Sequence, residues 1–165
     1  MEMDIEQKRA AAIQELAILD TPPEERFDRL TRLAMNIFDV PAAQVTLLDN
    51  ERLWFKSNLG SHLTEIPRAI SFCTHTVDTA DGFMLVEDAS VDPVFSRNPL
   101  VIADPLVRFY AGVSLVHTNG VPLGTFCILD RKSRVLTKTQ RLILKDLAAT
   151  AQHKLVTMQL AMLDD

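Results

Sequence analysis

The sequence predicts an α+β domain with a central antiparallel sheet, and two observations carry this prediction. Residues 108–130 form two apolar runs around Asn119-Gly120, and Asn-Gly between β-rich runs is a strong signal for a β-hairpin. Both runs are apolar along most of their length, so we expect both faces of this hairpin to be covered. Helical patterns stand at both ends of the chain, and hairpin-linked strands between helices are typical of α+β domains.

Composition fits one domain over residues 1–165. With 47% hydrophobic and 24% charged residues, the chain has the make-up of an ordinary globular protein. The net charge of −5 and the scattered basic residues do not fit a nucleic-acid binder. No apolar run approaches the roughly 20 residues that cross a bilayer, and the acidic start, Met1-Glu2-Met3-Asp4, lacks the pattern of a signal peptide. We expect a cytoplasmic location, no nucleic-acid or membrane partner, and free thiols at Cys73 and Cys127.

The N-terminal part predicts two helices. Residues 5–19 carry a helical apolar stripe made of Ile5, Ala12, Ile13, Leu16 and Leu19. The segment Asp20-Thr21-Pro22-Pro23 ends this helix and opens the next, because Thr21 can cap it and Glu24 completes a capping box. The second helix is expected to run to about Asp39, with an apolar face of Phe27, Leu30, Ala34, Ile37 and Phe38.

The middle of the chain predicts three strands and a short helix before the hairpin. Residues 43–48 and 53–58 read as strands of a hairpin, and residues 60–67 read as irregular. Ser71 is a candidate cap for a helix over 72–79 that places Cys73 and Thr76 on one side. A short strand follows at 83–86. Residues 87–106 contain three prolines and read as a long connection with about one turn of helix, and such connections often bind ligands.

A long helix is predicted over residues 137–163. Thr137 and Gln140 form a capping-box pair at its start, and its apolar seam holds Leu144, Leu147, Ala151, Leu155, Met158 and Met162. At 1.5 Å per residue this helix spans roughly 40 Å, which is longer than one face of a small sheet needs. We therefore expect its outer half to pack on the first helix, on a second copy of the protein, or on both. The helices over 5–19 and 137–163 are predicted dimer elements around a core of about residues 22–136. They should cover one face of the sheet, with the short helix and the long connection on the other.

Six ordered motifs resemble a bacterial GAF domain, of the branch found alone or ahead of histidine kinase and diguanylate cyclase modules. They are Leu19-Asp20-Thr21-Pro22-Pro23-Glu24-Glu25-Arg26-Phe27-Asp28, Trp54-Phe55-Lys56-Ser57, Ser71-Phe72-Cys73-Thr74-His75, Asn98-Pro99-Leu100, Arg108-Phe109-Tyr110-Ala111-Gly112 and Leu123-Gly124-Thr125. The resemblance implies a profilin-like or PAS-like sheet of order 2-1-5-4-3 and a small-molecule pocket under the short helix and long connection. It also implies dimerisation through the terminal helices. It names no ligand, because GAF domains hold cyclic nucleotides, bilins, haem or small metabolites, so the cofactor is unknown.

The chain departs from this family at informative positions. Ser114 stands where the branch usually has proline, and Thr74 separates Cys73 from His75, whereas bilin-binding relatives usually have the two residues adjacent. The Asn-Lys-…-Phe-…-Asp-Glu pattern of cyclic-nucleotide-binding GAF domains is absent. The motifs and the predicted pocket together give these candidate ligand contacts: Trp54, Phe72, Cys73, His75, Arg97, Arg108, Tyr110 and Ser114.

Two of these positions have competing interpretations. Cys73 is either a low-pKa thiol with a redox or nucleophilic role, or a small buried hydrophobe beside a structural His75. Residues two apart on a helix point in different directions, which argues against a Cys–His couple. Arg108 either binds an anionic group of a ligand, or pairs with Asp88, Asp92 or Asp104 and holds the long connection in place. Cys127 is expected to be an inert core thiol, and His62, His117 and His153 to lie in loops or at the surface.

The function predicted from these residues is a non-enzymatic sensory domain that binds a small molecule and relays its presence to a signalling partner. No phosphate-binding loop, Ser-His-Asp order or metal-ligand spacing is present, so we expect neither catalytic residues nor a metal. Two alternatives remain. One is a cysteine-based redox sensor or an enzyme like the methionine sulfoxide reductases built on this fold. The other is a structural dimerisation module with a filled pocket.

Overall fold

A computed structural model describes residues 3–164, and the side chains of residues 3–157. Two N-terminal helices, α1 (Ile5–Leu16) and α2 (Glu25–Phe38), precede the strands β1 (Ala42–Leu48), β2 (Arg52–Leu59) and β3 (Glu65–Pro67). Then come a 3₁₀ turn η1 (Arg68–Ile70), α3 (Phe72–Val77), β4 (Phe83–Val86), a second 3₁₀ turn η2 (Ala89–Val91) and α4 (Pro99–Ile102). The chain continues through β5 (Phe109–Val116), β6 (Pro122–Asp130) and α5 (Lys138–Asp164).

The strands form one six-stranded antiparallel sheet of order β3-β2-β1-β6-β5-β4. Without its edge strand β3, this is the 2-1-5-4-3 order implied by the family resemblance, so that prediction is confirmed. β3 falls in the segment predicted to be irregular. It is only three residues long and pairs Arg52 with Pro67, too short a stretch for an alternating pattern to show in the sequence.

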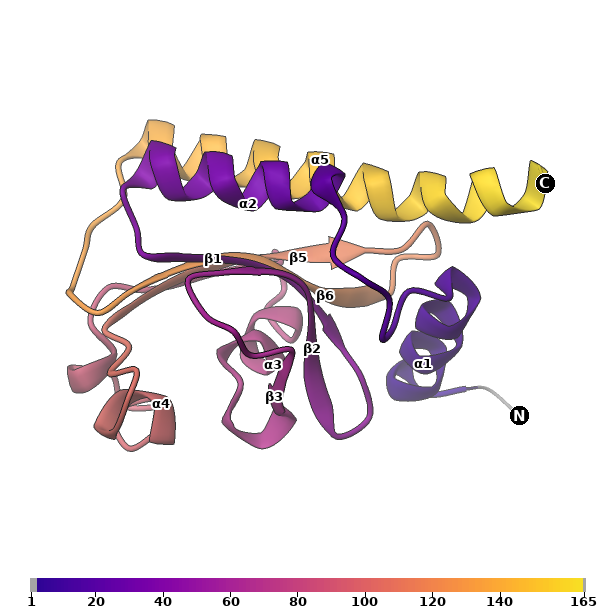
Figure 1. The fold of residues 1–165 in the computed structure, drawn as a ribbon. Coiled ribbons are helices and arrows are strands. Elements are labelled where there is room, and N and C mark those ends of the chain that lie inside the picture. Colours follow the sequence, from indigo (N-terminus) through magenta and orange to yellow (C-terminus); the bar gives the residue numbers. More distant parts are fainter. Residues whose placement is uncertain (1–2, 165) are drawn as a thin grey trace.

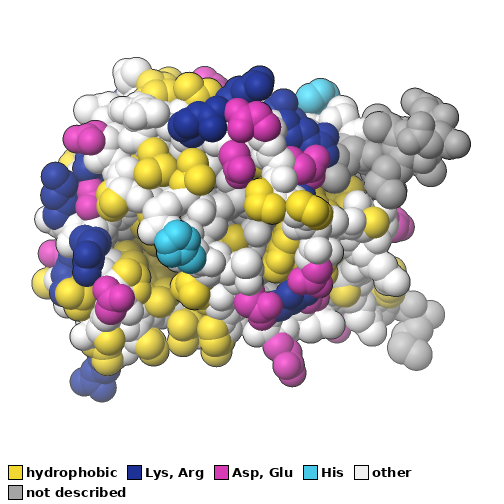
Figure 2. All heavy atoms as spheres, viewed as in Figure 1, with side chains coloured by type: hydrophobic (Ala, Val, Ile, Leu, Met, Phe, Trp, Pro, Cys, Tyr) yellow, Lys and Arg dark blue, Asp and Glu magenta, His cyan; other side chains and the backbone are white. Residues whose placement is uncertain are grey.

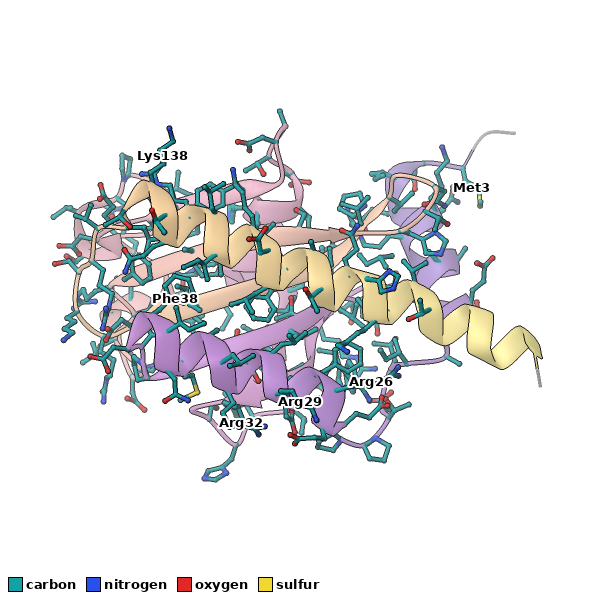
Figure 3. The ribbon with its side chains drawn as sticks, turned by 90° about the horizontal axis from the view of Figure 1, so that it is seen from above. Met3, Arg26, Arg29, Arg32, Phe38 and Lys138 are labelled. Carbon is teal, nitrogen blue, oxygen red and sulfur yellow. The ribbon has the colours of Figure 1, made fainter. Side chains whose placement is uncertain are left out.

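Helices and loops cover the two faces of the sheet separately (Figure 1). α2 and α5 lie side by side on one face, as Figure 3 shows from above, and α3 and α4 lie on the other. Each face has its own apolar core. On the helical side Phe27, Ala34, Leu144 and Ala151 pack on Phe109 and Phe126, and on the other side Phe72, Val77 and Phe95 pack on Tyr110 and Cys127. Both faces of the β5–β6 hairpin are therefore covered, as predicted.

The turn between β5 and β6 differs from the expected mirror-image turn. Only Gly120 has a positive φ, of 87°, and five residues separate the strands. The N–H of Gly120 donates to the carbonyl of His117, so a four-residue turn ends in a left-handed glycine. The hairpin itself is confirmed, because Asn-Gly serves this longer loop as well as it serves a two-residue turn.

The N-terminal helices are shorter than predicted. α1 ends at Leu16 because Ala17 adopts a left-handed conformation, and α2 begins at Glu25, whose N-cap Glu24 makes no side-chain cap bond. Thr21 is therefore not the cap of α2: its hydroxyl donates to the carbonyl of Ile18. Ile37 is also wrong as a core residue, because it is 46% exposed while Thr31 takes the buried position on that face.

α5 begins with the predicted capping box, in which the amide of Gln140 donates to Thr137 and the amide of Thr137 donates to the Gln140 side chain. Leu144, Ala151 and Leu155 of its seam are buried. The predicted contacts of Met158 and Met162 lie outside the described side chains. α1 packs against α5 and β6 at one end of the sheet, and Arg9 Nε donates to the carbonyl of Pro122 across 2.7 Å. No helix within residues 3–164 is long and apolar enough to cross a membrane.

Candidate functional site

A pocket of about 680 Å³ opens on the sheet face opposite α2 and α5. Its walls come from β2, β6, α3, the loop that follows β2, and the segment between α4 and β5. Figure 2 shows hydrophobic side chains gathered on this face over the region of α4 and its neighbouring loop. Burial of apolar surface by a ligand would supply most of the binding free energy at such a site.

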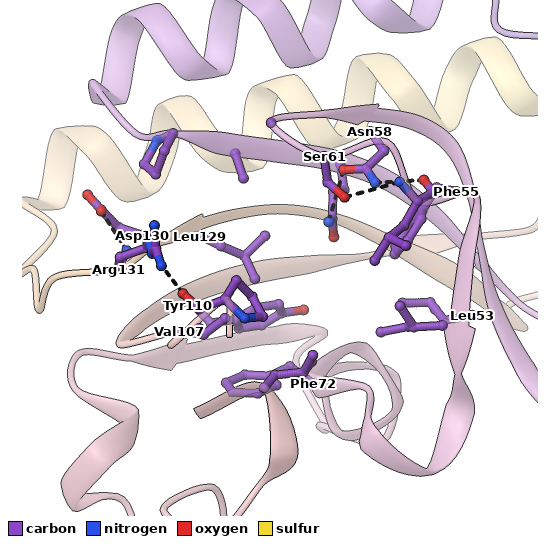
Figure 4. Close-up of a pocket in the computed structure, with 18 of the residues that line it drawn as sticks. Leu53, Phe55, Asn58, Ser61, Phe72, Val107, Tyr110, Leu129, Asp130 and Arg131 are labelled. Atoms are coloured by element: carbon purple, nitrogen blue, oxygen red, sulfur yellow. Dashed lines mark hydrogen bonds between the residues drawn. The ribbon is translucent and has the colours of Figure 1, made fainter. Parts of the chain in front are cut away.

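The floor of the pocket is apolar. Leu53 and Phe55 of β2 face Tyr110 and Leu129 across the sheet, and Phe72 of α3 closes one side (Figure 4). Phe72 is itself fixed by Phe95, whose ring stacks on it at 4.2 Å between centroids and 13° between planes. An aromatic wall held by a second ring is a rigid surface for a flat or apolar ligand.

The rim of the pocket carries its polar groups. Asn58, Ser61 and His62 stand on one side, and Asp104, Asp130 and Arg131 on the other. Arg131 is already engaged, because its Nε donates to the carbonyl of Pro105 across 2.8 Å and its Nη2 lies 3.2 Å from Asp104 Oδ1. Asp130 accepts hydrogen bonds from the amides of Arg131 and Lys132 and pairs with Arg134. Both carboxylates of the rim are thus already paired, Asp104 with Arg131 and Asp130 with Arg134.

A hydrogen-bonded cluster centred on Cys73 borders the floor of the pocket. Thr125 Oγ1 donates to Cys73 Sγ across 3.1 Å, and the Tyr110 hydroxyl donates to the same sulfur across 3.4 Å. Tyr110 also lies 2.7 Å from Thr76 Oγ1, and Thr46 lies 2.9 Å from Thr125. Gly112 makes room for this arrangement, since a Cβ there would stand 2.2 Å from the Tyr110 hydroxyl.

The second thiol, Cys127, also reaches this cluster. It hydrogen-bonds Cys73 and donates to Gln44 Oε1 across 3.4 Å. Both cysteines are buried and free, as predicted. Cys127 lies in the core as expected, and the side of β6 that carries it packs against α3.

The two thiols are electrostatically unequal. Burial opposes ionisation of Cys73, yet hydrogen bonds from Cys127, Thr125, Tyr110 and Thr46 outweigh burial and lower its pKa to about 7. Burial, the hydrogen bond with Cys73 and the charge on that sulfur raise the pKa of Cys127 well above its ordinary value. The pKa of Tyr110 is raised by burial and by the same negative charge. A single thiolate, on Cys73, is therefore the favoured ionised form of the pair.

The structure brings together only part of the predicted set of ligand contacts. Phe72, Cys73 and Tyr110 line the pocket. Trp54 does not: it belongs to the core on the helical side, because neighbouring residues of β2 point to opposite faces. Ser114 is buried beside Gly82 and donates to the carbonyl of Thr76, which holds α3 to β5.

His75 is exposed and meets the edge of Phe95 at 5.0 Å, so it points away from Cys73 as the helical spacing predicts. Arg97 is exposed and outside the pocket lining. Arg108 donates from Nη1 to the carbonyls of Val101 and Val107, at 2.9 and 3.1 Å. It thus holds the long connection as expected, but through backbone carbonyls, while Asp104 pairs with Arg131 instead.

Several pocket residues were not identified from the sequence. The stretch 60–63 and residues 129–131 form the rim, and no local pattern marks them as ligand contacts. Gly60 offers the one useful signal: its φ is +104°, and a Cβ there would meet the carbonyl oxygen of Pro41 at 2.2 Å. A glycine after a strand indicated a turn, but not the close approach to Pro41 that shapes the rim.

Of the histidines, His62 lies on the pocket rim and His153 is exposed, as predicted. His117 lies in the loop between β5 and β6, as predicted, but it is buried there, and its Nε2 has no hydrogen-bond partner among the described residues. Within the described part of the chain, no group of three or more His, Cys, Asp or Glu side chains is arranged to hold a metal ion.

No family model matches the chain. Its sequence is similar to part of a cyclic di-GMP phosphodiesterase of Pseudomonas aeruginosa, with 36% identity over 129 residues. That match covers 78% of this chain, and the chain spans only 22% of the length of this curated relative.

Solved structures resemble the whole chain. A free methionine-R-sulfoxide reductase from Neisseria meningitidis in complex with its substrate superposes with a TM-score of 0.65 at 16% identity, over 98% of this chain and 96% of that one. The PixJ GAF domain of Thermosynechococcus elongatus gives 0.61 at 14% identity, over 99% and 93%. A GAF sensor protein from Burkholderia vietnamiensis gives 0.59 at 16%, over 96% and 94%. These likenesses, together with the strand order, show that the chain has the fold of a GAF domain.

Proposed function

We propose that this chain is a non-enzymatic sensory domain of signal transduction that binds a small molecule in the pocket under α3 and α4. The observation that carries the proposal is the pocket itself. Its volume of about 680 Å³ suits a metabolite-sized ligand, and its floor of Leu53, Phe55, Phe72 and Leu129 is apolar. The polar groups stand at the rim, where they can orient a ligand without being buried unpaired.

The charges of the rim support a particular ligand chemistry. Arg131 is already bonded to Asp104 and Pro105, and Arg134 to Asp130, so neither guanidinium is unengaged. A phosphate needs unengaged cationic or amide donors, and this rim offers few. The proposed ligand therefore has an aromatic or aliphatic body with a few neutral hydrogen-bonding groups.

The proposed output is cyclic di-GMP turnover by a partner protein. Support comes from the similarity to part of a protein named as a cyclic di-GMP phosphodiesterase. Because the rim is poor in free cations, cyclic di-GMP itself fits the pocket badly. We infer that this nucleotide belongs to the output of the pathway and not to the ligand site.

A route for the relay runs from the pocket to the terminal helices. Asn98, the cap of α4, donates from Nδ2 to the carbonyl of Ile70 in η1. In the same 3₁₀ turn, Arg68 binds Glu6 of α1 with both terminal nitrogens. α1 in turn packs on α5. Closing of the α4 segment over a ligand would therefore act on α1 and α5, to the extent that the ligand binds the closed form more tightly.

The proposed state of assembly is a homodimer, and the exposed apolar side chains favour the pair α2 and α5 as its interface in place of the predicted pair, the helices over 5–19 and 137–163. Leu33 and Ile37 of α2 are 43% and 46% exposed, and Leu142 of α5 is 55% exposed. These three side chains define an apolar patch on the outer side of the helical layer. A second copy of the same patch would cover it symmetrically.

Fluorescence titration with the neutral dye N-phenyl-1-naphthylamine tests the ligand site. We expect saturable binding by the unmodified protein and a Kd at least about tenfold weaker in Leu129→Trp, which fills the pocket. Leu142→Trp, on the outer side of α5, is the matched control and should bind as the unmodified protein does.

Two results would contradict the proposal. One is the absence of saturable binding to the unmodified protein, which would favour a purely structural module. The other is unchanged binding by a folded Leu129→Trp variant, which would place the dye elsewhere. Addition of cyclic di-GMP should not displace the dye. Native mass spectrometry of the protein as purified would report both a retained ligand and the oligomeric state.

A further inference from the structure

We propose that Cys73 and Cys127 are a dithiol pair that a hydroperoxide converts into an intramolecular disulfide, which makes the core beneath the pocket responsive to oxidants. This inference is independent of the proposed ligand, since it concerns two thiols of the chain itself. It rests on the contact between the cysteines, the donors around Cys73 and the access that the pocket gives to one sulfur.

The first argument is the contact between two segments that are far apart in the sequence. Cys73 lies in the first turn of α3 and Cys127 in the middle of β6, opposite Gly112 of β5. The absence of a side chain at Gly112 leaves the space above this part of the sheet open to Tyr110 and α3. Thr125, two residues before Cys127 on the same side of β6, donates to Cys73 Sγ across 3.1 Å, and both cysteines lie in one apolar core.

The second argument is the set of donors on Cys73. Thr125 and Tyr110 both donate to its sulfur, at 3.1 and 3.4 Å, and Thr46 Oγ1 lies 2.9 Å from Thr125 Oγ1. Buried hydroxyl groups that converge on one sulfur stabilise its thiolate, which is the nucleophilic form. A cysteine that served only as a small core hydrophobe would need no such set.

The third argument is access. Cys73 lines the pocket floor next to Phe72, whereas Cys127 lies behind it and is fully buried. The proposed path of hydrogen peroxide is this pocket, because Cys73 is 3% exposed and belongs to its lining, whereas Cys127 does not. Cys127 keeps its proton, which it shares with Gln44 and Cys73, until the first sulfur has been oxidised.

The chemistry then takes two steps. The Cys73 thiolate attacks one peroxide oxygen, the O–O bond breaks, and the hydroxide that leaves takes up a proton to become water. Cys73 is now a sulfenic acid. Cys127 loses its proton and attacks the Cys73 sulfur, the S–O bond breaks and a second water leaves, so the net change is two thiols and one peroxide to one disulfide and two waters. Exchange with an external dithiol restores the two thiols.

Oxidation would also change the shape of the pocket. A disulfide replaces the thiolate that accepts from Thr125 and Tyr110, and it fixes the first turn of α3 to β6. Phe72, the neighbour of Cys73 in the chain, forms the aromatic wall of the pocket. The pocket of the oxidised protein should therefore differ in shape from that of the reduced protein.

The experiment treats the folded, reduced protein with hydrogen peroxide, removes the excess, and then alkylates under denaturing conditions before mass spectrometry. We expect the unmodified protein to lose both alkylation sites and about 2 Da, and to regain both sites after dithiothreitol. Cys127→Ser should stop at a sulfenic acid on Cys73 that reacts with dimedone. Cys73→Ser should leave Cys127 unoxidised under the same conditions.

A second measurement distinguishes oxidation of a thiolate that the fold stabilises from ordinary thiol oxidation. The rate of reaction with peroxide should rise with pH around a midpoint near 7 in the unmodified protein, and this midpoint should move upward in Thr125→Val, which removes one donor. Two results would overturn the proposal: both thiols intact after peroxide treatment of the folded protein, or disulfides only between separate chains on a non-reducing gel.

Discussion

At the scale of single residues, Lys56 explains why the N-terminal part of the chain folds as it does. Its side chain is fully buried, and its Nζ donates to Thr21 Oγ1 at 2.8 Å and to the Pro22 carbonyl at 2.7 Å. It also lies 2.6 Å from Glu24 Oε2. The ammonium group thus holds the segment between α1 and α2 against β2. Thr21 is used in this contact, which is why it does not cap α2.

Replacement of Lys56 tests this role. Lys56→Met keeps the length of the apolar stem but leaves the Pro22 carbonyl and Thr21 without their donor. We expect the free energy of unfolding to fall by about 2–3 kcal/mol, because hydrogen bonds to a buried charged group are among the stronger ones. Urea denaturation measures the change. Arg32→Met is the control: both side chains of the Arg32–Glu25 pair are exposed, so its loss should cost less than about 1 kcal/mol.

Two glycines give a matched test of how closely the sheet is packed. A Cβ at Gly124 would stand 1.9 Å from the backbone carbonyl of Thr46, whereas one at Gly120 would meet nothing within 4 Å. Gly124→Ala should therefore destabilise the protein by about 3 kcal/mol, since backbone must move. Gly120→Ala should lower the free energy of unfolding by only about 1 kcal/mol, because alanine must adopt the positive φ of this position. Equal losses in thermal unfolding would show that β1 and β6 separate more easily than their register implies.

At the scale of elements, α1 makes a few polar contacts in addition to the core packing of Ala12, Ile13 and Leu16. Arg68 binds Glu6, and Arg9 joins the same carboxylate while donating to the Pro122 carbonyl. The hydrogen bond from Arg68, opposed by desolvation and helped by Arg9, lowers the pKa of Glu6 to about 2. Because the folded pKa lies below the ordinary value of 4.5, this pair stabilises the fold above about pH 4.5 and is lost as the pH falls toward 2.

Acidification should therefore loosen α1 before the rest of the fold. Glu6 is 46% exposed, so solvent screening limits the effect to about 1 kcal/mol or less, about a fivefold change. We expect hydrogen-exchange protection factors of α1 to fall between pH 5 and pH 2.5 relative to those of α2. In Glu6→Gln the protection should be low already at pH 5, and an unchanged acid response in that variant would rule out this pair as the cause.

The elements show where sequence patterns suffice and where they fail. β4, α3 with its Ser71 cap, and the capping box of α5 were predicted from local chemistry alone, because the signals lie within a few residues of each other. β3 was missed, because its pairing with β2 is set by the preceding loop and not by its own three residues. The local capping pattern around Thr21 predicted an earlier start for α2 than the structure shows. The tertiary contact of Lys56 with Thr21 overrides that pattern.

At the scale of the whole molecule, the outer patch of the helical layer gives a prediction about assembly. Ile37→Asp places a carboxylate in the patch of Leu33, Ile37 and Leu142, where the exposed isoleucine contributes little to the core. We expect the unmodified protein to have the mass of a dimer by light scattering and the variant that of a monomer, with the same melting temperature. Leu63→Asp, on the pocket side, is the control and should leave the mass unchanged. A monomeric unmodified protein would contradict the proposed dimer.

The candidate site was less predictable than the fold. Motifs identified Phe72, Cys73 and Tyr110 correctly as residues of the pocket face, because α3 and β5 were placed correctly. They did not identify residues 60–63 or 129–131, since the rim forms only when the loop after β2 meets the segment before β5. The proximity of Cys73 and Cys127 likewise arises only when the chain folds. No spacing in the sequence joins them, and only the packing of α3 on β6 does.

The edges of the sheet have a consequence for how this molecule meets others. An open strand edge is a template on which further chains can add as strands, which leads toward fibres. One edge here is β3, which is only three residues long, bears an exposed Glu65 and ends in Pro67, a residue with no N–H to offer. The other is β4, only four residues long. Because both edge strands are so short, they give little template for extension of the sheet by further chains.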